Sequence, residues 1–247
     1  MTPDICRMSK EELLGLESYA VQRLLESDEV IYIAQSLSAF WTYDWEAAKQ
    51  GKAGMHAILK SKRHSDGFFV SRILLAPENI LRIVSAQIAM RLREVIGVIP
   101  DYVIGVPDGA TKLGECIATI LGARNASMVK DKNTKLMFLE TIINPEETVL
   151  LVEDFCTRGT GFAEAVQVVK TAQPMANILP YDPVIINRGG LKQISVGDEE
   201  YTILPVVEWR VQDWEPEECP LCIEFGSTPI KPKETDENWE KITHSQL

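Results

Sequence analysis

The chain has 247 residues and a formal net charge of −11 at pH 7, and 45% of its residues are apolar. This length and composition fit one large domain with a sizeable core, and the negative charge opposes nonspecific binding to nucleic acid or to an anionic membrane. No membrane-spanning run or signal peptide is visible and the five scattered cysteines argue against a disulfide scaffold, so we expect a cytoplasmic protein.

The N-terminal part of the chain begins with a helix signal. Ser9 followed by Glu12 matches a capping box, which predicts a helix start near residue 10. Apolar residues then recur at helical spacing as far as Leu25, so we expect an amphipathic first helix. The run EVIYIA, residues 29–34, predicts a short strand, whereas residues 35–58 show no clear period.

Beyond Pro77 the pattern alternates between helices and strands. Helical spacing is found at 78–96, 112–122 and 161–172, and apolar strand-like runs are found at 102–106, 148–153 and 182–187. Apolar strands that alternate with helices are typical of a parallel sheet covered on both faces. We therefore expect an α/β fold.

The tail from about Trp214 is rich in proline and charge and has little periodicity. We therefore expect a main domain at 1–213 and a C-terminal extension at 214–247. The CPLC stretch at 219–222 could supply two zinc ligands, with His244 as a third, but we find no second pair. We favour a structural turn there and expect no metal ligands in the chain.

Glu153 and Asp154 end an apolar run within LLVEDFCTRGTGFAEAV, residues 150–166. In an open α/β sheet, ligands bind beyond the carboxyl ends of the strands, where carboxylates can accept hydrogen bonds from a diol or reach a metal-bound water. The loop CTRGTG, residues 156–161, offers backbone N–H groups, hydroxyls and a helix start, which together can hold a phosphate. The alternative is a strand end followed by a polar turn.

An apolar run, two acids, two further residues and then Thr-x-Gly-Thr resembles the ribose-phosphate signature of the type I phosphoribosyltransferases. The resemblance implies a parallel sheet flanked by helices, with an N-terminal hood segment and a C-terminal extension. It implies that Glu153 and Asp154 hold the ribose hydroxyls of phosphoribosyl pyrophosphate (PRPP). It also implies that the loop holds the 5′-phosphate of PRPP, through Thr157, Arg158, Gly159, Thr160 and Gly161. Arg158 replaces a residue that is usually small in the family.

Three further stretches resemble the orotate phosphoribosyltransferases in particular. LKSKRHSDGFF, residues 59–69, resembles a family segment in which Lys60 would reach a phosphate of PRPP, and Phe68 and Phe69 would lie against the pyrimidine. Lys62 stands where the family usually has glycine. IGVPDGATKLGECIA, residues 104–118, resembles the loop that wraps the pyrophosphate, where Lys112 would meet anionic oxygens.

PVIINRGG, residues 183–190, places Arg188 where the family has an arginine for the base, and a guanidinium matches the carboxylate of orotate with two hydrogen bonds. The stretch SMVKDKNTKLMFLETI, residues 127–142, stands where the family has a mobile loop that closes over the neighbouring subunit's site. It has Val129 where an arginine is common and contains no histidine or glycine. The resemblance assigns catalytic roles to Lys130, Lys132 and Lys135 of this loop and to Asp154.

The implied activity is that of a glycosyltransferase of pyrimidine nucleotide synthesis. A ring nitrogen of orotate displaces pyrophosphate from C1 of PRPP to give orotidine 5′-monophosphate, and catalysis rests on positioning, electrostatic stabilisation and exclusion of water. Mg²⁺ bound through the pyrophosphate is expected, as is a homodimer that shares the mobile loop. Two alternatives stay open: transfer to another nucleobase, or a PRPP-sensing regulator without turnover. The acidic chain lacks the basic DNA-binding appendages that would favour such a regulator.

Overall fold

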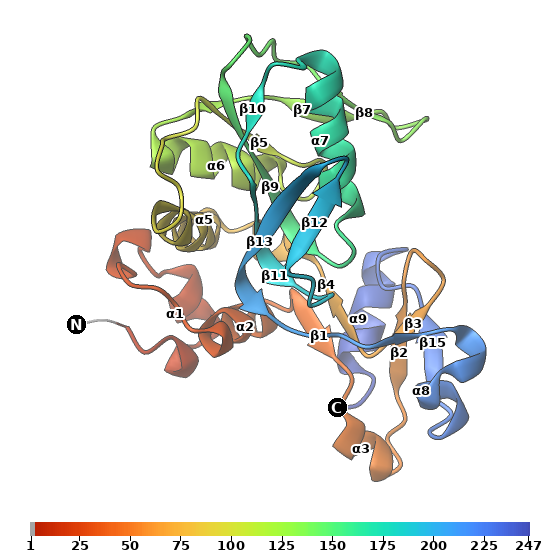
Figure 1. The fold of residues 1–247 in the computed structure, drawn as a ribbon. Coiled ribbons are helices and arrows are strands. Elements are labelled where there is room, and N and C mark those ends of the chain that lie inside the picture. The colour runs from red at the N-terminus through yellow and green to blue at the C-terminus, as the bar shows by residue number, and fades with distance from the viewer. Residues whose placement is uncertain (1–2) are drawn as a thin grey trace. The chain divides into compact units, whose positions relative to one another are not determined.

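A computed structural model describes residues 3–247, which divide into two compact units (Figure 1). Unit 1 comprises residues 3–33 and 71–210, and unit 2 comprises residues 34–70 and 211–247. Each unit is therefore assembled from two separate segments of the chain. This division differs from the expected boundary at residue 214, because the C-terminal segment shares a compact unit with residues 34–70.

Unit 1 is built around a mainly parallel sheet. Its strand order is β12-β13-β11-β9-β5-β6, with β10 beside β9, and all neighbours are parallel except β12 and β13. The strands are β5 (Tyr102–Gly105), β6 (Arg124–Asn125), β9 (Thr148–Cys156), β10 (Asn177–Ile178), β11 (Tyr181–Asn187), β12 (Gln193–Val196) and β13 (Glu199–Glu208). The expected parallel sheet is confirmed.

Three long helices cover this sheet: α5 (Glu78–Arg93), α6 (Thr111–Leu121) and α7 (Thr160–Ala172). Phe162 of α7 packs in one core cluster with Leu151 of β9, and its ring lies 5.2 Å from that of Tyr201. Because successive strand residues point to opposite faces, Leu150 and Val152 face the other side, where α5 and α6 lie (Figure 1). All three expected helices are confirmed.

The N-terminal segment differs from the expectation. The capping box of Ser9 and Glu12 is present, but α1 (Lys10–Leu14) is short and is capped by Gly15. The prediction of a long first helix was therefore wrong. A 3₁₀ turn, η1 (Ile5–Arg7), precedes α1, and another, η2 (Ser18–Ala20), follows it. The strand expected at 29–34 was also wrong, because these residues belong to α2 (Ser27–Ser36). A short apolar run fits a buried helix as well as a strand, and acidic residues in the first turn favour the helix.

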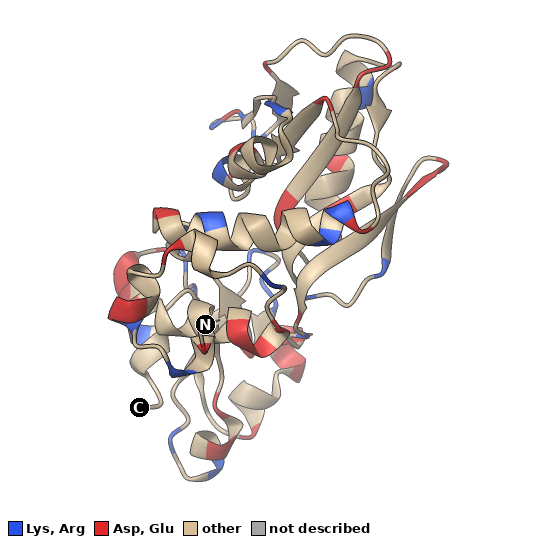
Figure 2. Ribbon diagram, turned by 90° about the vertical axis from the view of Figure 1, so that its left-hand side faces the viewer, with Lys and Arg blue, Asp and Glu red and all other residues tan. Residues whose placement is uncertain are grey.

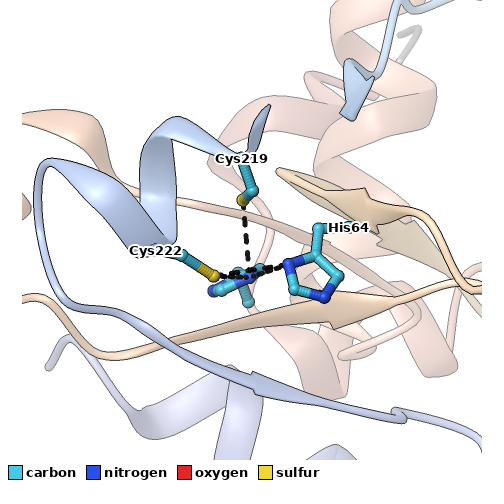
Figure 3. A group of neighbouring side chains, drawn as sticks. His64, Cys219 and Cys222 are labelled. Atoms are coloured by element: carbon cyan, nitrogen blue, oxygen red, sulfur yellow. Dashed lines mark hydrogen bonds between the residues drawn. The ribbon is translucent and has the colours of Figure 1, made fainter. Parts of the chain in front are cut away.

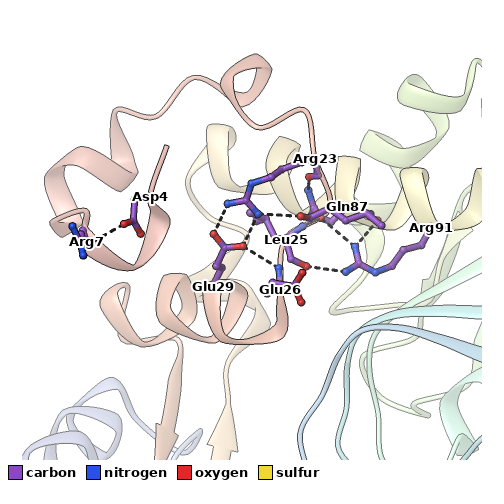
Figure 4. A network of polar contacts seen from close by, with 9 residues as sticks. Asp4, Arg7, Arg23, Leu25, Glu26, Glu29, Gln87 and Arg91 are labelled. Atoms are coloured by element: carbon purple, nitrogen blue, oxygen red, sulfur yellow. Dashed lines mark hydrogen bonds and ion pairs between the residues drawn. The ribbon is translucent and has the colours of Figure 1, made fainter. Parts of the chain in front are cut away.

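The N-terminal segment is fastened to α5 by a network of polar contacts (Figure 4). The buried Gln87 accepts a hydrogen bond from the Leu25 N–H at 2.6 Å and donates one to the Arg23 carbonyl at 2.9 Å. Arg91 donates to the Leu25 carbonyl at 3.0 Å, and Arg23 forms an ion pair with Glu29. These contacts satisfy backbone groups that would otherwise be costly to bury.

The remaining elements of unit 1 are short. The helix α4 (Ser71–Leu74) precedes α5, and the antiparallel strands β7 (Met128–Lys130) and β8 (Met137–Leu139) form a hairpin. This β7–β8 hairpin occupies the position of the expected mobile loop. Asp131 shapes its tip, since Oδ1 accepts hydrogen bonds from the N–H groups of Asn133 and Thr134.

Unit 2 contains two small sheets. One pairs β1 (Phe40–Thr42) with β4 (Gly67–Phe69), and the other has the order β14-β3-β2-β15, formed by Asp213–Trp214, His64–Ser65, Met55–Ile58 and Thr228–Ile230. Both chain segments therefore contribute strands to the second sheet. The other elements are α3 (Trp45–Lys49), η3 (Pro216–Glu218), α8 (Pro220–Ile223) and α9 (Asp236–His244).

The excess of acidic residues is not confined to one element. Figure 2 shows Asp and Glu on helices and loops of both units, interspersed with Lys and Arg. Among residues 3–247, no helix combines the length and the apolar character needed to cross a membrane.

Candidate functional site

The expected ligand-binding edge of the unit 1 sheet lies at the carboxyl ends of β5 and β9. These two strands are parallel neighbours, but β5 leads through α6 to β6 on one side, while β9 leads through α7 towards β10 and β11 on the other. The direction of the connections reverses between them, and open α/β sheets bind ligands at such a switch point. Both α6 and α7 begin at this edge, so their N-termini lie near any ligand bound there.

Glu153 lies within β9, because the strand continues past the acid pair to Cys156. Its side chain is 8% exposed. Burial, and to a lesser extent the nearby charges of Asp182 and Asp154, raise the pKa of this carboxyl to about 9, against the lowering effect of a hydrogen bond from the backbone of Phe162. A Cβ atom added to Gly161 would lie 2.6 Å from Oε1 of Glu153. The carboxyl group therefore lies directly beneath the start of α7.

Asp154 is half-buried, and its Oδ1 accepts a hydrogen bond from the Phe155 N–H at 3.0 Å. The loop that follows β5 approaches this carboxylate so closely that a Cβ on Gly109 would overlap with Oδ2. This loop also contains a cis peptide bond between Pro107 and Asp108. The candidate pyrophosphate loop and the second acid of the pair are thus adjacent.

The segment from Thr157 to Gly161 makes the turn from β9 into α7. Gly159 is the N-cap of α7 and has a φ of 67°, a left-handed conformation that glycine adopts at little cost. A Cβ on Gly159 would also lie 2.5 Å from the side chain of Ile194. Arg158 and Thr160 are exposed and Thr157 is half-buried. Backbone N–H groups at the start of a helix favour an anion, which fits the expected phosphate site.

Arg188 follows β11 and is held against this turn. Its N–H donates a hydrogen bond to the Cys156 carbonyl at 2.7 Å, and a Cβ on Gly189 would overlap with the Thr157 carbonyl. The side chain is 7% exposed, and its guanidinium carbon lies 5.5 Å from the centre of the Phe155 ring. The structure thus brings together the acid pair, the phosphate turn and Arg188.

Asp182 was not singled out in the sequence, although it interrupts the apolar strand β11. The side chain is fully buried, and neither carboxyl oxygen has a hydrogen-bond partner among residues 3–247. Burial raises its pKa to about 8. The sequence signal that could have drawn attention to Asp182 is its position as the single acid in the apolar run YDPVIIN. Burying a charge inside a strand is costly, so an acid there is unusual.

The other expected site residues of unit 1 are lysines with exposed or half-buried side chains. Lys112, in the first turn of α6, lines a surface depression between α5 and α6 with Glu115 and Cys116. Lys132 and Lys135 are exposed at the tip of the β7–β8 hairpin, and Lys130 is half-buried on β7. Among residues 3–247, none of these ammonium groups forms a salt bridge.

The three candidate residues of the 59–69 stretch belong to unit 2. Lys60 is exposed in the turn between β2 and β3. Phe69 is fully buried with its ring 6.4 Å from that of Phe40, so it forms part of the core of unit 2. Phe68 is 9% exposed, and its ring lies 6.0 Å from that of Trp239.

The chain is similar in sequence to curated enzymes. It is 30% identical over 178 residues to an orotate phosphoribosyltransferase of Heliobacterium modesticaldum, a match that covers 72% of this chain and 88% of the relative. The chain belongs to the orotate phosphoribosyltransferase family. A second family member, from Chlorobaculum parvum, is 29% identical over 170 residues, which are 68% of this chain and 82% of the relative.

A solved structure supports the fold of this family member. The crystal structure of orotate phosphoribosyltransferase from Aeropyrum pernix matches with a TM-score of 0.51 and 19% identity, covering 72% of this chain and 93% of that chain. The type I phosphoribosyltransferase fold is therefore confirmed. No model of a protein family matches the sequence.

Proposed function

We propose that this chain transfers the 5-phosphoribosyl group of PRPP to orotate, giving orotidine 5′-monophosphate and pyrophosphate. The observation that carries the proposal is the arrangement at the switch point. A glycine-containing turn opens α7 directly above Glu153, and Arg188 is fastened to that turn through Cys156. Family membership supports the same reaction.

The turn at 157–161 suits the 5′-phosphate, because it combines two threonine hydroxyls with the N-terminus of a helix. Asp154, half-exposed beside the turn, suits the ribose hydroxyls as an acceptor. Glu153 lies beneath Gly161 with a raised pKa, so it is protonated near neutral pH and can donate as well as accept a hydrogen bond. The two acids would therefore have different roles.

The pyrophosphate would lie against the loop after β5, which touches Asp154 at Gly109, with Lys112 nearby at the start of α6. The base would lie where Arg188 can pair with the carboxylate of orotate. Lys130, Lys132 and Lys135 would add positive charge as pyrophosphate leaves. Lys60 would supply a further cation and Phe68 would support the pyrimidine, whereas Phe69 is fully buried in the core of unit 2. These assignments follow from the family resemblance.

The site suits Mg²⁺, since the carboxylate of Asp154 and the oxygens of pyrophosphate are hard donors that this cation prefers. When bound, the cation neutralises charge on the departing pyrophosphate. Asp154 orients the ribose, the 157–161 turn anchors the phosphate, and Arg188 fixes the ring so that its nitrogen faces C1. We also propose a homodimer in which the β7–β8 hairpin reaches the partner subunit's site.

The test is an assay of pyrophosphate release with PRPP, Mg²⁺ and a panel of orotate, uracil, hypoxanthine and adenine. Orotate should be the preferred base by at least about tenfold, because the others lack the carboxylate that Arg188 would bind. A clear preference for another base would overturn the orotate assignment. PRPP binding without pyrophosphate release with any base would instead identify a regulator.

A further inference from the structure

Unit 2 contains a compact group of two histidines and two cysteines that the transferase reaction does not use. It comprises His56 of β2, His64 of β3, Cys219 at the N-cap of α8 and Cys222 within α8. One ligand atom from each side chain lies within 4.8 Å of all the others. Three of the four residues are buried and Cys222 is half-buried. In Figure 3, the dashed lines from both sulfurs and from the His64 ring meet at the fourth side chain of the group.

The distances between the ligand atoms fit a tetrahedral metal site. The Nε2 atom of His56 lies 3.6 Å from the Cys219 sulfur and 3.5 Å from the Cys222 sulfur, and the Cys222 sulfur lies 3.4 Å from Nδ1 of His64. Zinc bonds of about 2.3 Å to sulfur and 2.0 Å to nitrogen place sulfur and nitrogen ligands about 3.5 Å apart in a tetrahedron. The two nitrogens are 3.0 Å apart, against about 3.3 Å for the same geometry.

Hydrogen bonds alone do not explain this arrangement. His64 and both cysteines approach the same Nε2 atom of His56. A neutral imidazole nitrogen has a single lone pair and can accept only one of these three contacts. A cation between the four atoms accepts a lone pair from each of them, so it satisfies the whole group.

A neighbouring hydroxyl orients His56 for this role. The Ser227 hydroxyl donates to the Gly54 carbonyl at 3.2 Å, so its oxygen is available to accept the Nδ1–H of His56, 2.9 Å away. A neutral imidazole that carries its proton on Nδ1 has its lone pair on Nε2, the atom that faces the cysteines. Metal-binding histidines are usually held by such a second hydrogen bond.

We propose that His56, His64, Cys219 and Cys222 form a structural zinc site. Two sulfur and two nitrogen ligands are typical of zinc, and four protein ligands leave no open position for catalysis. The site joins the β2–β3 hairpin to the C-terminal segment, which are far apart in the sequence. A compact unit of fewer than about 80 residues often needs such a crosslink in addition to its core.

From the sequence we expected a plain turn at 219–222 and considered zinc, with His244 as a third ligand, as the alternative. In the structure His244 lies on the exposed side of α9, with Nδ1 2.8 Å from the Glu240 carbonyl, and is outside the group. The second pair of ligands is His56 and His64, which are eight residues apart on paired strands. Our expectation that the chain has no metal ligands is replaced by this proposal.

The first test measures the metal content of the full chain, purified under reducing conditions without added zinc. We expect one zinc per chain by mass spectrometry of the native protein and by elemental analysis. Cys222→Ser and His64→Gln should lose it, whereas the matched controls Cys6→Ser and His244→Gln, exposed and outside the group, should retain it. Ser227→Ala should weaken zinc binding by about 10- to 100-fold.

A second test does not depend on variants that fold. Zinc in the unaltered chain is exchanged for Co²⁺, and we expect the visible absorption of a tetrahedral cobalt site with thiolate ligands. A reduced chain that contains no zinc and takes up neither Zn²⁺ nor Co²⁺ would overturn the proposal. So would full zinc content in both ligand variants, or a Cys219–Cys222 disulfide in the native, metal-free protein. Neither test measures transferase activity, so the outcome is independent of the proposed reaction.

Discussion

The Arg188 guanidinium is buried beside the Phe155 ring at the end of β11. A ligand carboxylate that reaches it competes with little water, and a charge-assisted pair of this kind contributes about 1.5–3 kcal/mol. Arg188→Ala should therefore lower the affinity for orotate by about one to two powers of ten. Lysine should restore only part of the loss, because it lacks the planar fork. Calorimetry with orotate and with PRPP measures both affinities.

PRPP affinity is the internal control for this variant, since the 157–161 turn and the acid pair remain. A similar loss for both ligands would show that the Arg188 side chain supports the whole site rather than the base alone, since its backbone hydrogen bond to the Cys156 carbonyl remains in the variant. An unchanged orotate affinity would remove Arg188 from the base site.

Asp182 makes stability depend on pH. Its pKa is raised by burial to about 8, whereas an unfolded aspartate has a pKa of about 3.9. The protonated form is favoured by folding, so its contribution to stability is full below pH 4 and is lost as the pH rises through 8. Asp182→Asn, which cannot ionise, should flatten the decline of the melting temperature between pH 4 and pH 9.

The exposed Asp198 provides the control, since Asp198→Asn should leave this pH dependence unchanged. Glu153, whose pKa is raised to about 9 by burial first and by the charge of Asp182 second, should still cause part of the decline. An Asp182→Asn variant whose melting curves fall with pH as steeply as those of the parent would contradict the argument.

Lys62 has a φ of 70° in the turn between β2 and β3, at the position where the family usually has glycine. A residue with a Cβ is strained there by about 1–2 kcal/mol, whereas glycine is not, although glycine loses more entropy on folding. Lys62→Gly should therefore raise the stability by up to about 1 kcal/mol, measured by chemical denaturation. Ser61→Gly, at the neighbouring turn residue without a positive φ, should lower it.

At the scale of the element, the turn into α7 depends on the close approach of Gly161 to Glu153. Gly161→Ala would place Cβ 2.6 Å from Oε1 of a buried carboxyl group. The helix start must shift to relieve this overlap, so PRPP affinity should fall by about tenfold or more, as expected for misplaced binding groups. Gly97→Ala is the matched control, because an added Cβ there meets no atom within 4 Å. Unchanged PRPP affinity would place the phosphate elsewhere.

The elements also show what the sequence could predict. Periodicity was sufficient to predict the elements that have long local patterns. These are the strands β5, β9 and β11 and the helices α5, α6 and α7. The apolar run at 29–34 was too short to separate helix from strand. The metal-ligand group could not be read from spacing, because its two pairs are brought together only by the tertiary structure of unit 2.

At the scale of the whole molecule, zinc and PRPP should protect different elements. Removal of zinc with a strong chelator should speed amide hydrogen exchange in the β2–β3 hairpin and around α8, because the crosslink between these elements is lost. The central strand β9 of unit 1 should be unaffected, whereas PRPP should slow exchange at residues 157–163. Mass spectrometry of peptides measures both effects, and chelator-induced exchange confined to unit 1 would contradict the assignment.

The interrupted construction of unit 2 has a consequence for biosynthesis. Residues 34–70 leave the ribosome long before residues 211–247, which contain their partner strands β14 and β15. At about 5–20 residues per second, the intervening segment takes roughly seven to thirty seconds to be made. Throughout this time His56 and His64 lack both cysteines, and the apolar side chains of the β2–β3 hairpin lack their cover. The nascent chain must therefore complete unit 2 last, which makes its exposed first half a target for chaperones during translation.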